Sequence, residues 1–191
     1  MATTSAPRGR WRRWPNEMAN SLLQRLDARD RALFVRWSTP HALSWRARTF
    51  WVAVTHLGSA WCTLIAALVP QLGTGPLRDV GTLPFSVLVV SHLVIQGIKR
   101  TIGRPRPSRS HVHASLIDEP DRFSFPSGHA AAAMAVALGF AFGVPQLAAP
   151  LVMLATLVGL SRVVLGVHFP GDVIAGQAIA FVTAVCTVLL R

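Results

Sequence analysis

Long apolar runs separated by short polar or basic segments dominate this chain from residue 50 onward. About twenty residues at a rise of 1.5 Å each are enough to cross a hydrocarbon core of about 30 Å. Five runs approach that length: Phe50 to Val69, Leu83 to Ile98, Gly128 to Val144, Ala148 to Leu165 and Val173 to Leu190. Pro70 ends the first run, and Pro145 marks a turn after the third. The pattern predicts an all-α fold, a polytopic membrane bundle of about five transmembrane helices.

The first 48 residues follow a different pattern. Between Asn16 and Trp37, apolar residues recur near helical spacing while charged residues occupy the rest of the helical wheel. The charges between Arg25 and Arg31 rule out a span. This segment is therefore either an amphipathic helix at the membrane interface or a helix packed against the bundle. We divide the chain into a basic, disordered tail over 1–15, the amphipathic interfacial helix and connector over 16–48, and a membrane domain over 49–191.

Composition and charge both favour a membrane protein. With 51% hydrophobic residues, 14% charged residues and a mean hydropathy of +0.43, the chain is too apolar for an average soluble domain. A net charge of +11 is also typical of nucleic-acid binding, but the arginines gather in the first 48 residues and between 99 and 122, with long uncharged runs between them. That distribution favours membrane lipids as partners and disfavours nucleic acid.

Three polar segments, each at the end of an apolar run, carry groups that bind or attack a phosphoryl group. They hold Lys99 and Arg106, then Ser127, Gly128 and His129, then Arg162, His168 and Asp172. Arginine forks and a lysine ammonium offset phosphate charge. A serine at a helix N-cap, followed by glycine, adds a hydroxyl and backbone N–H donors. With five spans, all three segments lie on one face of the membrane.

His168 and Asp172 lie four residues apart at the start of the last apolar run. A carboxylate there can hold the imidazole by one ring nitrogen and leave the other unprotonated, as a nucleophilic histidine requires. His129 can then protonate the leaving oxygen, so that phosphoryl transfer needs no metal and no cofactor. Singly, each motif also fits a structural His–Asp pair, a metal half-site or an ordinary helix start. The three together, in this order, favour catalysis.

These motifs resemble the signatures of the type 2 phosphatidic acid phosphatase (PAP2) superfamily, which includes membrane lipid phosphate phosphatases and soluble vanadium haloperoxidases. The signatures are a lysine, six residues, then Arg-Pro; Pro-Ser-Gly-His; and Ser-Arg, five residues, histidine, three residues, aspartate. They stand complete here as Lys99 with Arg106-Pro107, Pro126 to His129, and Ser161-Arg162 with His168 and Asp172. The spacing selects Arg106 rather than Arg104 as the arginine of the first signature.

The resemblance implies roles for the individual residues. His168 corresponds to the nucleophile, Asp172 to its orienting partner and His129 to the general acid, while the phosphate binders are Lys99, Arg106, Ser127, Gly128 and Arg162. The implied activity is metal-independent hydrolysis of a lipid phosphate through a phosphohistidine, with a polyprenyl phosphate or diphosphate favoured over a phosphatidate-type lipid. The alternatives are a lipid phosphotransferase and a non-catalytic scaffold or transporter, although the latter predicts a broken signature.

The distribution of basic residues also predicts the orientation in the membrane. The face with the three motifs carries ten arginines before residue 50 and six basic residues from Lys99 to Arg122, whereas the opposite face has only Arg78 and Arg191. The positive-inside rule therefore predicts a catalytic face in the cytoplasm. The resemblance implies the opposite, because many members of that family place their site on the outer face. The resemblance to short bacterial members of the family implies a bacterial inner membrane.

Overall fold

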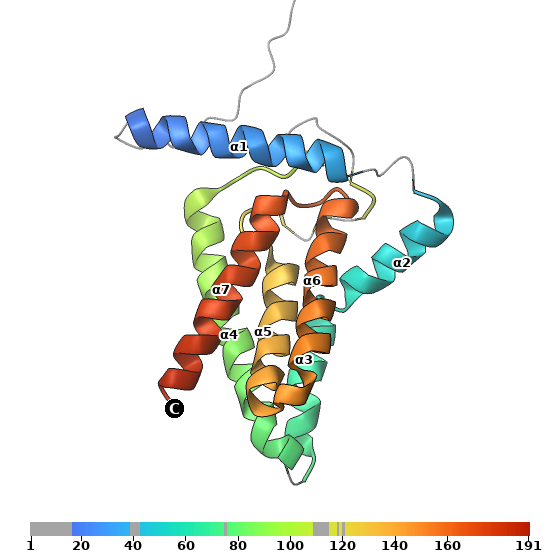
Figure 1. Cartoon of the computed structure of the whole chain (residues 1–191), viewed down its shortest axis with the longest axis vertical. Helices are drawn as coiled ribbons and strands as arrows, with labels where there is room; N and C mark the ends of the chain where they lie inside the picture. Colours follow the sequence, from blue (N-terminus) through green and yellow to red (C-terminus); the bar gives the residue numbers. More distant parts are fainter. Residues whose placement is uncertain (1–16, 39–42, 75, 109–114, 118, 120) are drawn as a thin grey trace, which may run out of the picture.

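The computed structural model describes residues 17–38, 43–74, 76–108, 115–117, 119 and 121–191, which form a helical bundle with one helix laid across its end (Figure 1). The helices are α1 (Glu17–Trp37), α2 (Trp45–His56), α3 (Ala60–Leu68), α4 (Pro76–Ile102), α5 (Gly128–Gly143), α6 (Ala148–Val164) and α7 (Pro170–Leu189), with short 3-10 turns η1 (Val69–Leu72) and η3 (Pro145–Leu147). The all-α prediction is confirmed. The predicted tail over 1–15 lies outside the described residues.

Three segments of the described chain are long and apolar enough to cross a membrane: Val80–Ile102, Pro145–Val164 and Pro170–Leu189. Helices α2 and α3 give a fourth if they are taken as one span bent by 49°. Helix α5 is apolar but has only 16 residues. The expected count of five requires both the bent pair and α5 to cross, and it stays a prediction.

The first predicted span is broken rather than straight. Helix α2 ends at His56, and Ser59 then caps α3 by accepting a hydrogen bond from the backbone N–H of Cys62 at 3.4 Å. A side chain at Gly58 would not fit, because its Cβ would lie 2.6 Å from Cγ1 of Val158 and 2.9 Å from the carbonyl oxygen of His129. The break therefore brings the chain against α5 and α6, a tertiary contact that hydropathy does not reveal.

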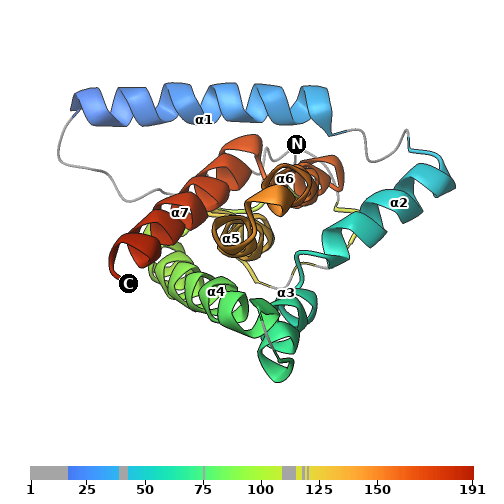
Figure 2. The same ribbon diagram turned by 60° about the horizontal axis from the view of Figure 1, so that its bottom comes forward.

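Helix α5 occupies the centre of the bundle and contacts α4, α6 and α7 (Figure 2). Its buried face is rich in alanine, and small residues let helices approach closely. At Gly139 a Cβ would lie 2.3 Å from Cα of Pro84 on α4, so the two backbones are in contact there. This central position fixes the N-terminal end of α5, where Ser127 and His129 lie.

Helix α1 crosses the end of the bundle and contacts α6 and α7 (Figure 1). Phe34 is fully buried and packs edge-on against Phe169, with ring centroids 5.2 Å apart. Leu33, Val35 and Trp37 are exposed on the same helix. One face of α1 thus packs on the bundle, as one of the two interpretations of the sequence expected, while the placement of its apolar exposed side chains in a lipid interface stays a prediction.

Candidate active site

The structure brings all the predicted site residues to the end of the bundle that α1 covers. Lys99 lies in the last turn of α4, Arg106 and Ser127 in the segment between α4 and α5, Gly128 and His129 at the start of α5, Arg162 near the end of α6, His168 in the connection to α7, and Asp172 in the first turn of α7. Four helix ends and two connections thus supply the side chains.

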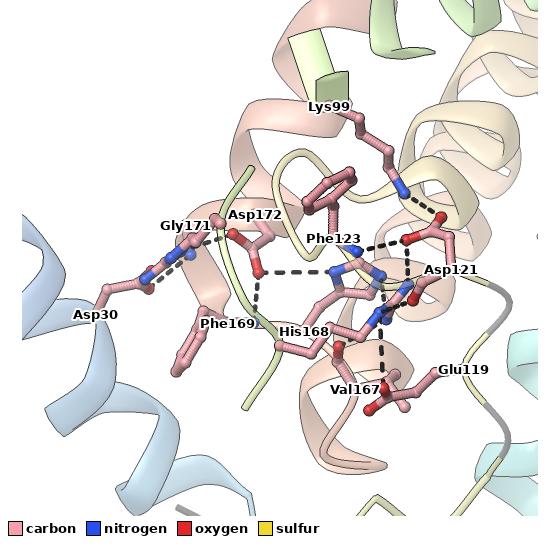
Figure 3. A network of polar contacts seen from close by, with 12 residues as sticks. Asp30, Lys99, Glu119, Asp121, Phe123, Val167, His168, Phe169, Gly171 and Asp172 are labelled. Atoms are coloured by element: carbon pink, nitrogen blue, oxygen red, sulfur yellow. Dashed lines mark hydrogen bonds and ion pairs between the residues drawn. The ribbon is translucent and has the colours of Figure 1, made fainter. Parts of the chain in front are cut away.

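His168 is buried, with 1% of its surface exposed, in the turn between α6 and α7. The backbone N–H groups of Val167 and His168 both donate to the carbonyl of Arg162, each at 3.1 Å. Nε2 of His168 lies 3.2 Å from Nη1 of Arg106, and Nδ1 lies 3.6 Å from Oδ2 of Asp172 (Figure 3). The second distance is longer than a hydrogen bond. One ring nitrogen therefore faces a cation and the other faces a carboxylate.

The surroundings of His168 favour its neutral form. Burial, followed by the positive charges of Arg106, Arg162 and Lys99, holds the pKa of His168 well below its ordinary value of 6.5. A neutral imidazole keeps one unprotonated ring nitrogen, and this nitrogen can attack an electrophile.

Asp172 is fully buried and makes hydrogen bonds through both carboxylate oxygens. Oδ2 accepts the backbone N–H of Phe169 at 2.8 Å, and Oδ1 accepts Nη1 of Arg104 at 2.6 Å. The backbone carbonyl of Asp172 accepts the N–H of Ser127 at 2.9 Å. The start of α7 is thereby tied to the start of α5, and the two histidine-bearing segments are held together.

Asp121 bridges the two cations that the first signature supplies. Nζ of Lys99 donates to Oδ2 of Asp121 at 2.6 Å, and Nη2 of Arg106 donates to Oδ1 at 3.1 Å (Figure 3). Burial would raise the pKa of Asp121, but the hydrogen bonds and charges of Lys99 and Arg106 outweigh it and lower that pKa. An ionised carboxylate therefore contacts two of the side chains expected to bind phosphate.

Arg162 is buried and only partly hydrogen-bonded within the described part of the chain. Its Nη1 donates to Oγ1 of Thr55 at 2.7 Å, whereas Nε and Nη2 have no hydrogen-bond partner there. Oγ of Ser127, also buried, likewise lacks a partner among the described residues. Ser127 is the N-cap of α5 as expected, but its side chain makes no capping bond. Buried donors without partners are costly, and the oxygens of an anion would satisfy them.

A cavity of about 550 Å³ lies beside these groups, within the size range of small-molecule sites. One side of the cavity comes from the α2–α3 break, another from the segment before α5, and the third from the helices that carry the histidine and arginine. Its lining residues are Thr55, His56, Ser59, Leu116, Ile117, Glu119, His129 and Arg162. The cavity thus connects the predicted general acid and the partly bonded arginine to the bent first span.

No group of three or more His, Cys, Asp or Glu side chains within the described ranges could hold a metal ion. The sequence did not reveal Asp121, Arg104 or Asp30 as members of the polar network. Arg104 was set aside by spacing, although it contacts Asp172 directly. Asp30 reaches the network from α1, 141 residues before its partner Gly171, and no local pattern could signal that contact.

Fold and candidate site together describe an all-helical membrane protein with buried arginines beside a His–Asp pair. The family model of the PAP2 superfamily matches residues 81–191, more than half of the chain, and the chain belongs to that superfamily. The resemblance noted from the three motifs is thereby confirmed.

Relatives and a solved structure agree with this assignment. A decaprenylphosphoryl-5-phosphoribose phosphatase of Mycolicibacterium smegmatis is 40% identical over 131 residues, 65% of this chain and 68% of that protein. A lipid A 1-phosphatase of Rhizobium etli is 36% identical over 104 residues, 52% of this chain and 45% of the relative, so the chain spans about half the length of that protein. A crystal structure of a transmembrane PAP2-type phosphatidylglycerolphosphate phosphatase from Bacillus subtilis matches with a TM-score of 0.72 and 25% identity over 91% of each chain. The chain is an integral membrane protein.

Proposed function

We propose that this protein is a phosphatase that removes phosphate from a membrane lipid phosphate or diphosphate. The observation that carries the proposal is the set of buried donors on Arg162 and Ser127 that have no partner among the described residues, in a site that also holds His168 and His129. Such donors fit the oxygens of a phosphoryl group, and two histidines supply a nucleophile and a proton carrier. The names of the relatives support a lipid phosphate as the substrate.

In the first step, Nε2 of His168 attacks the phosphorus atom. The bond from phosphorus to the leaving oxygen breaks, its electron pair stays on that oxygen, and His129 supplies the proton. Asp172 stabilises the positive charge that develops on the imidazole, because it faces Nδ1. Lys99 and the guanidinium groups of Arg106 and Arg162 offset the charge on the phosphoryl oxygens.

In the second step, water attacks the phosphorus atom of the phosphohistidine. His129, which has lost its proton, now accepts one from the water. The P–N bond breaks and its electron pair returns to His168, so that inorganic phosphate leaves and both histidines regain their starting protonation. Neither step requires a metal or a cofactor.

We further propose that the lipid tail leaves the site along the bent first span. The cavity wall there includes Thr55 and Ser59, and Trp61 and Ile65 on α3 follow with 79% and 57% of their surfaces exposed. These apolar side chains suit contact with hydrocarbon. A polyprenyl phosphate or diphosphate is favoured over a phosphatidate-type lipid, and the name of the Mycolicibacterium smegmatis relative supports a polyprenyl substrate.

The test is turnover of a panel of polyprenyl, lipid A and glycerolipid phosphates by purified protein in detergent, with EDTA present. We expect release of inorganic phosphate from at least one lipid, and none with His168→Ala. Transfer of the phosphoryl group to an alcohol without phosphate release would show that the enzyme is a transferase rather than a hydrolase. Activity that disappears with EDTA and returns with a divalent cation would contradict the metal-independent mechanism.

We also propose that the site faces the cytoplasm of a bacterial inner membrane and that α1 lies in the lipid interface on that face. The support is the excess of arginine before residue 50 compared with the opposite face, which has Arg78 and Arg191. With five spans, a reporter fused after Arg191 lies outside. Alkaline phosphatase should be active there and green fluorescent protein dark, and the reverse pattern would place the catalytic face outside.

A further inference from the structure

Arg104 connects α1 to the carboxylate beside His168. Its Nη1 lies 2.6 Å from Oδ1 of Asp172 and 2.6 Å from Oδ2 of Asp30, and its Nη2 donates to Oδ1 of Asp27 at 2.7 Å. The guanidinium also lies over the ring of Phe169, 4.1 Å from its centroid. One buried arginine thus joins two carboxylates of α1 to the first turn of α7.

Asp30 makes a second connection to the same turn. Its Oδ1 accepts the backbone N–H of Gly171 at 2.7 Å (Figure 3). The approach is close, since a Cβ on Gly171 would lie 2.8 Å from Oδ2 of Asp30. Together with the contact between Phe34 and Phe169, this bond lets α1 hold both the backbone and the side chains of residues 169–172.

The two oxygens of the Asp172 carboxylate have different partners. Arg104 holds Oδ1, while Oδ2 accepts the N–H of Phe169 and faces Nδ1 of His168. Burial by itself would lower the pKa of Arg104, but the charges of Asp172 and Asp30 outweigh it and raise that pKa. Arg104 is therefore a permanent cation that fixes the rotation of the carboxylate.

We propose that Asp30 and Arg104 are positioning residues for the reaction: they hold Asp172 and the 169–172 turn so that Oδ2 stays opposite Nδ1 of His168. This inference rests on the proposed phosphatase function. Within the described residues, the side chains of Arg104 and Asp30 pair with each other and with Asp27, Asp172 and Gly171, so we expect both to act on the chemical step rather than on substrate binding. Helix α1, which lies outside the family match at 81–191, then becomes part of the catalytic apparatus.

Two substitutions at Asp30 separate its two contacts. Asp30→Ala removes both the acceptor for Gly171 and the charge beside Arg104, whereas Asp30→Asn keeps an acceptor oxygen and loses only the charge. For Asp30→Ala we expect kcat and the rate of phosphohistidine formation in rapid quench to fall by about tenfold or more, with KM changed by less than about twofold. Asp30→Asn should lie between Asp30→Ala and wild type. Arg29→Gln, an exposed charge loss on the same helix, is the matched control and should behave as wild type.

A double-variant series tests whether Asp30 acts through Arg104. If it does, Asp30→Ala combined with Arg104→Met should lose no more activity than Arg104→Met alone, because contacts in one network are not additive. Rates are taken per folded enzyme, from the amount of stable protein in detergent. If Arg104→Met does not fold, the kcat and KM values of the two Asp30 variants decide the question.

Unchanged kcat in both Asp30 variants would overturn the inference, and so would a raised KM at constant kcat. The wild-type protein is measured first, so that a failure of the positioning role is distinguished from a failure of the proposed mechanism. If the wild-type protein releases phosphate and becomes labelled on His168 while the Asp30 variants keep its kcat, only the positioning role is overturned. Wild-type protein that never labels on His168 overturns the proposed mechanism and this role with it.

Discussion

Asp121→Asn tests whether the bridging carboxylate competes with phosphate for its binding site. In the structure Asp121 contacts Lys99 at 2.6 Å and Arg106 at 3.1 Å, the two cations of the first signature. A phosphate that binds both cations must replace these contacts. The substitution keeps the size of the side chain and removes its charge, so we expect phosphate to bind more tightly.

The magnitude follows from the charges and their exposure. Two unit charges about 4 Å apart attract by about 4 kcal/mol at an effective dielectric constant near 20. The Asp121 side chain is 38% exposed, so solvent screening reduces the net contribution, and we take about 1.4 kcal/mol as the part that phosphate must overcome. That free energy corresponds to about tenfold in the competitive inhibition constant of inorganic phosphate or vanadate.

The assay is inhibition of lipid phosphate turnover by phosphate and by vanadate at fixed pH and ionic strength. Glu119→Gln serves as the matched control, because its carboxylate lies 4.0 Å from Nε of Arg106 and should change the inhibition constant less. Weaker inhibition of Asp121→Asn than of wild type would refute the competition, since it would mean that Asp121 chiefly orders Arg106 for binding.

Three further predictions concern the reaction itself. His168→Ala should abolish turnover and any acid-labile phosphoenzyme, whereas His129→Ala should lose most turnover but still trap label on His168; a near-normal rate for His168→Ala in rapid quench would contradict the assignment. Arg106→Lys and Arg162→Lys should each lower kcat/KM by at least about tenfold, or about 1.4 kcal/mol, because lysine keeps the charge but cannot bind two phosphate oxygens as a guanidinium does. A kcat/KM equal to that of the wild-type protein would show that bidentate binding is unimportant. Because the pKa of His168 lies below 6.5, protonation of His168 should cause no loss of kcat/KM, corrected for substrate ionisation, as pH falls through 6.5. Unfolded His168 does take up a proton there, so thermal stability in detergent should decrease below pH 6.5. A one-proton loss of activity as pH falls through 6.5 would contradict a neutral, buried nucleophile.

The features predicted correctly from the sequence are those that depend on local pattern. Apolar runs identified the membrane helices and the all-α fold, and the spacing of three motifs identified the superfamily. Helix limits were less accurate: the run predicted at Leu83 to Ile98 lies inside α4 (Pro76–Ile102), because polar and basic residues near the ends of a span remain helical beyond the hydrocarbon. Hydropathy measures solvation and does not report where a helix stops.

The missed features depend on contacts between distant segments. Arg104 and Arg106 both stand in the same short basic stretch, and only the fold shows that one contacts Asp172 and the other His168. Asp121 likewise resembles any loop carboxylate until α4 places Lys99 beside it. Sequence spacing can select the residue that fits a motif, but it cannot show that the neighbouring residue is also buried in the same network.

The break in the first span separates two helices that pack on different parts of the bundle. Helix α3 contacts α4 and α5, whereas α2 contacts α6, so the two halves are anchored on different sides of the cavity. At the junction, Gly58 leaves no space for a side chain, because an added Cβ would lie 2.9 Å from the carbonyl oxygen of His129. Thr55 on α2 holds Arg162, whereas Trp61 and Ile65 on α3 are exposed, so substitutions at these α3 positions leave the contact with Arg162 in place. On the proposed path of the lipid tail, α3 is then the part of the first span that can be adapted to lipids with different tails.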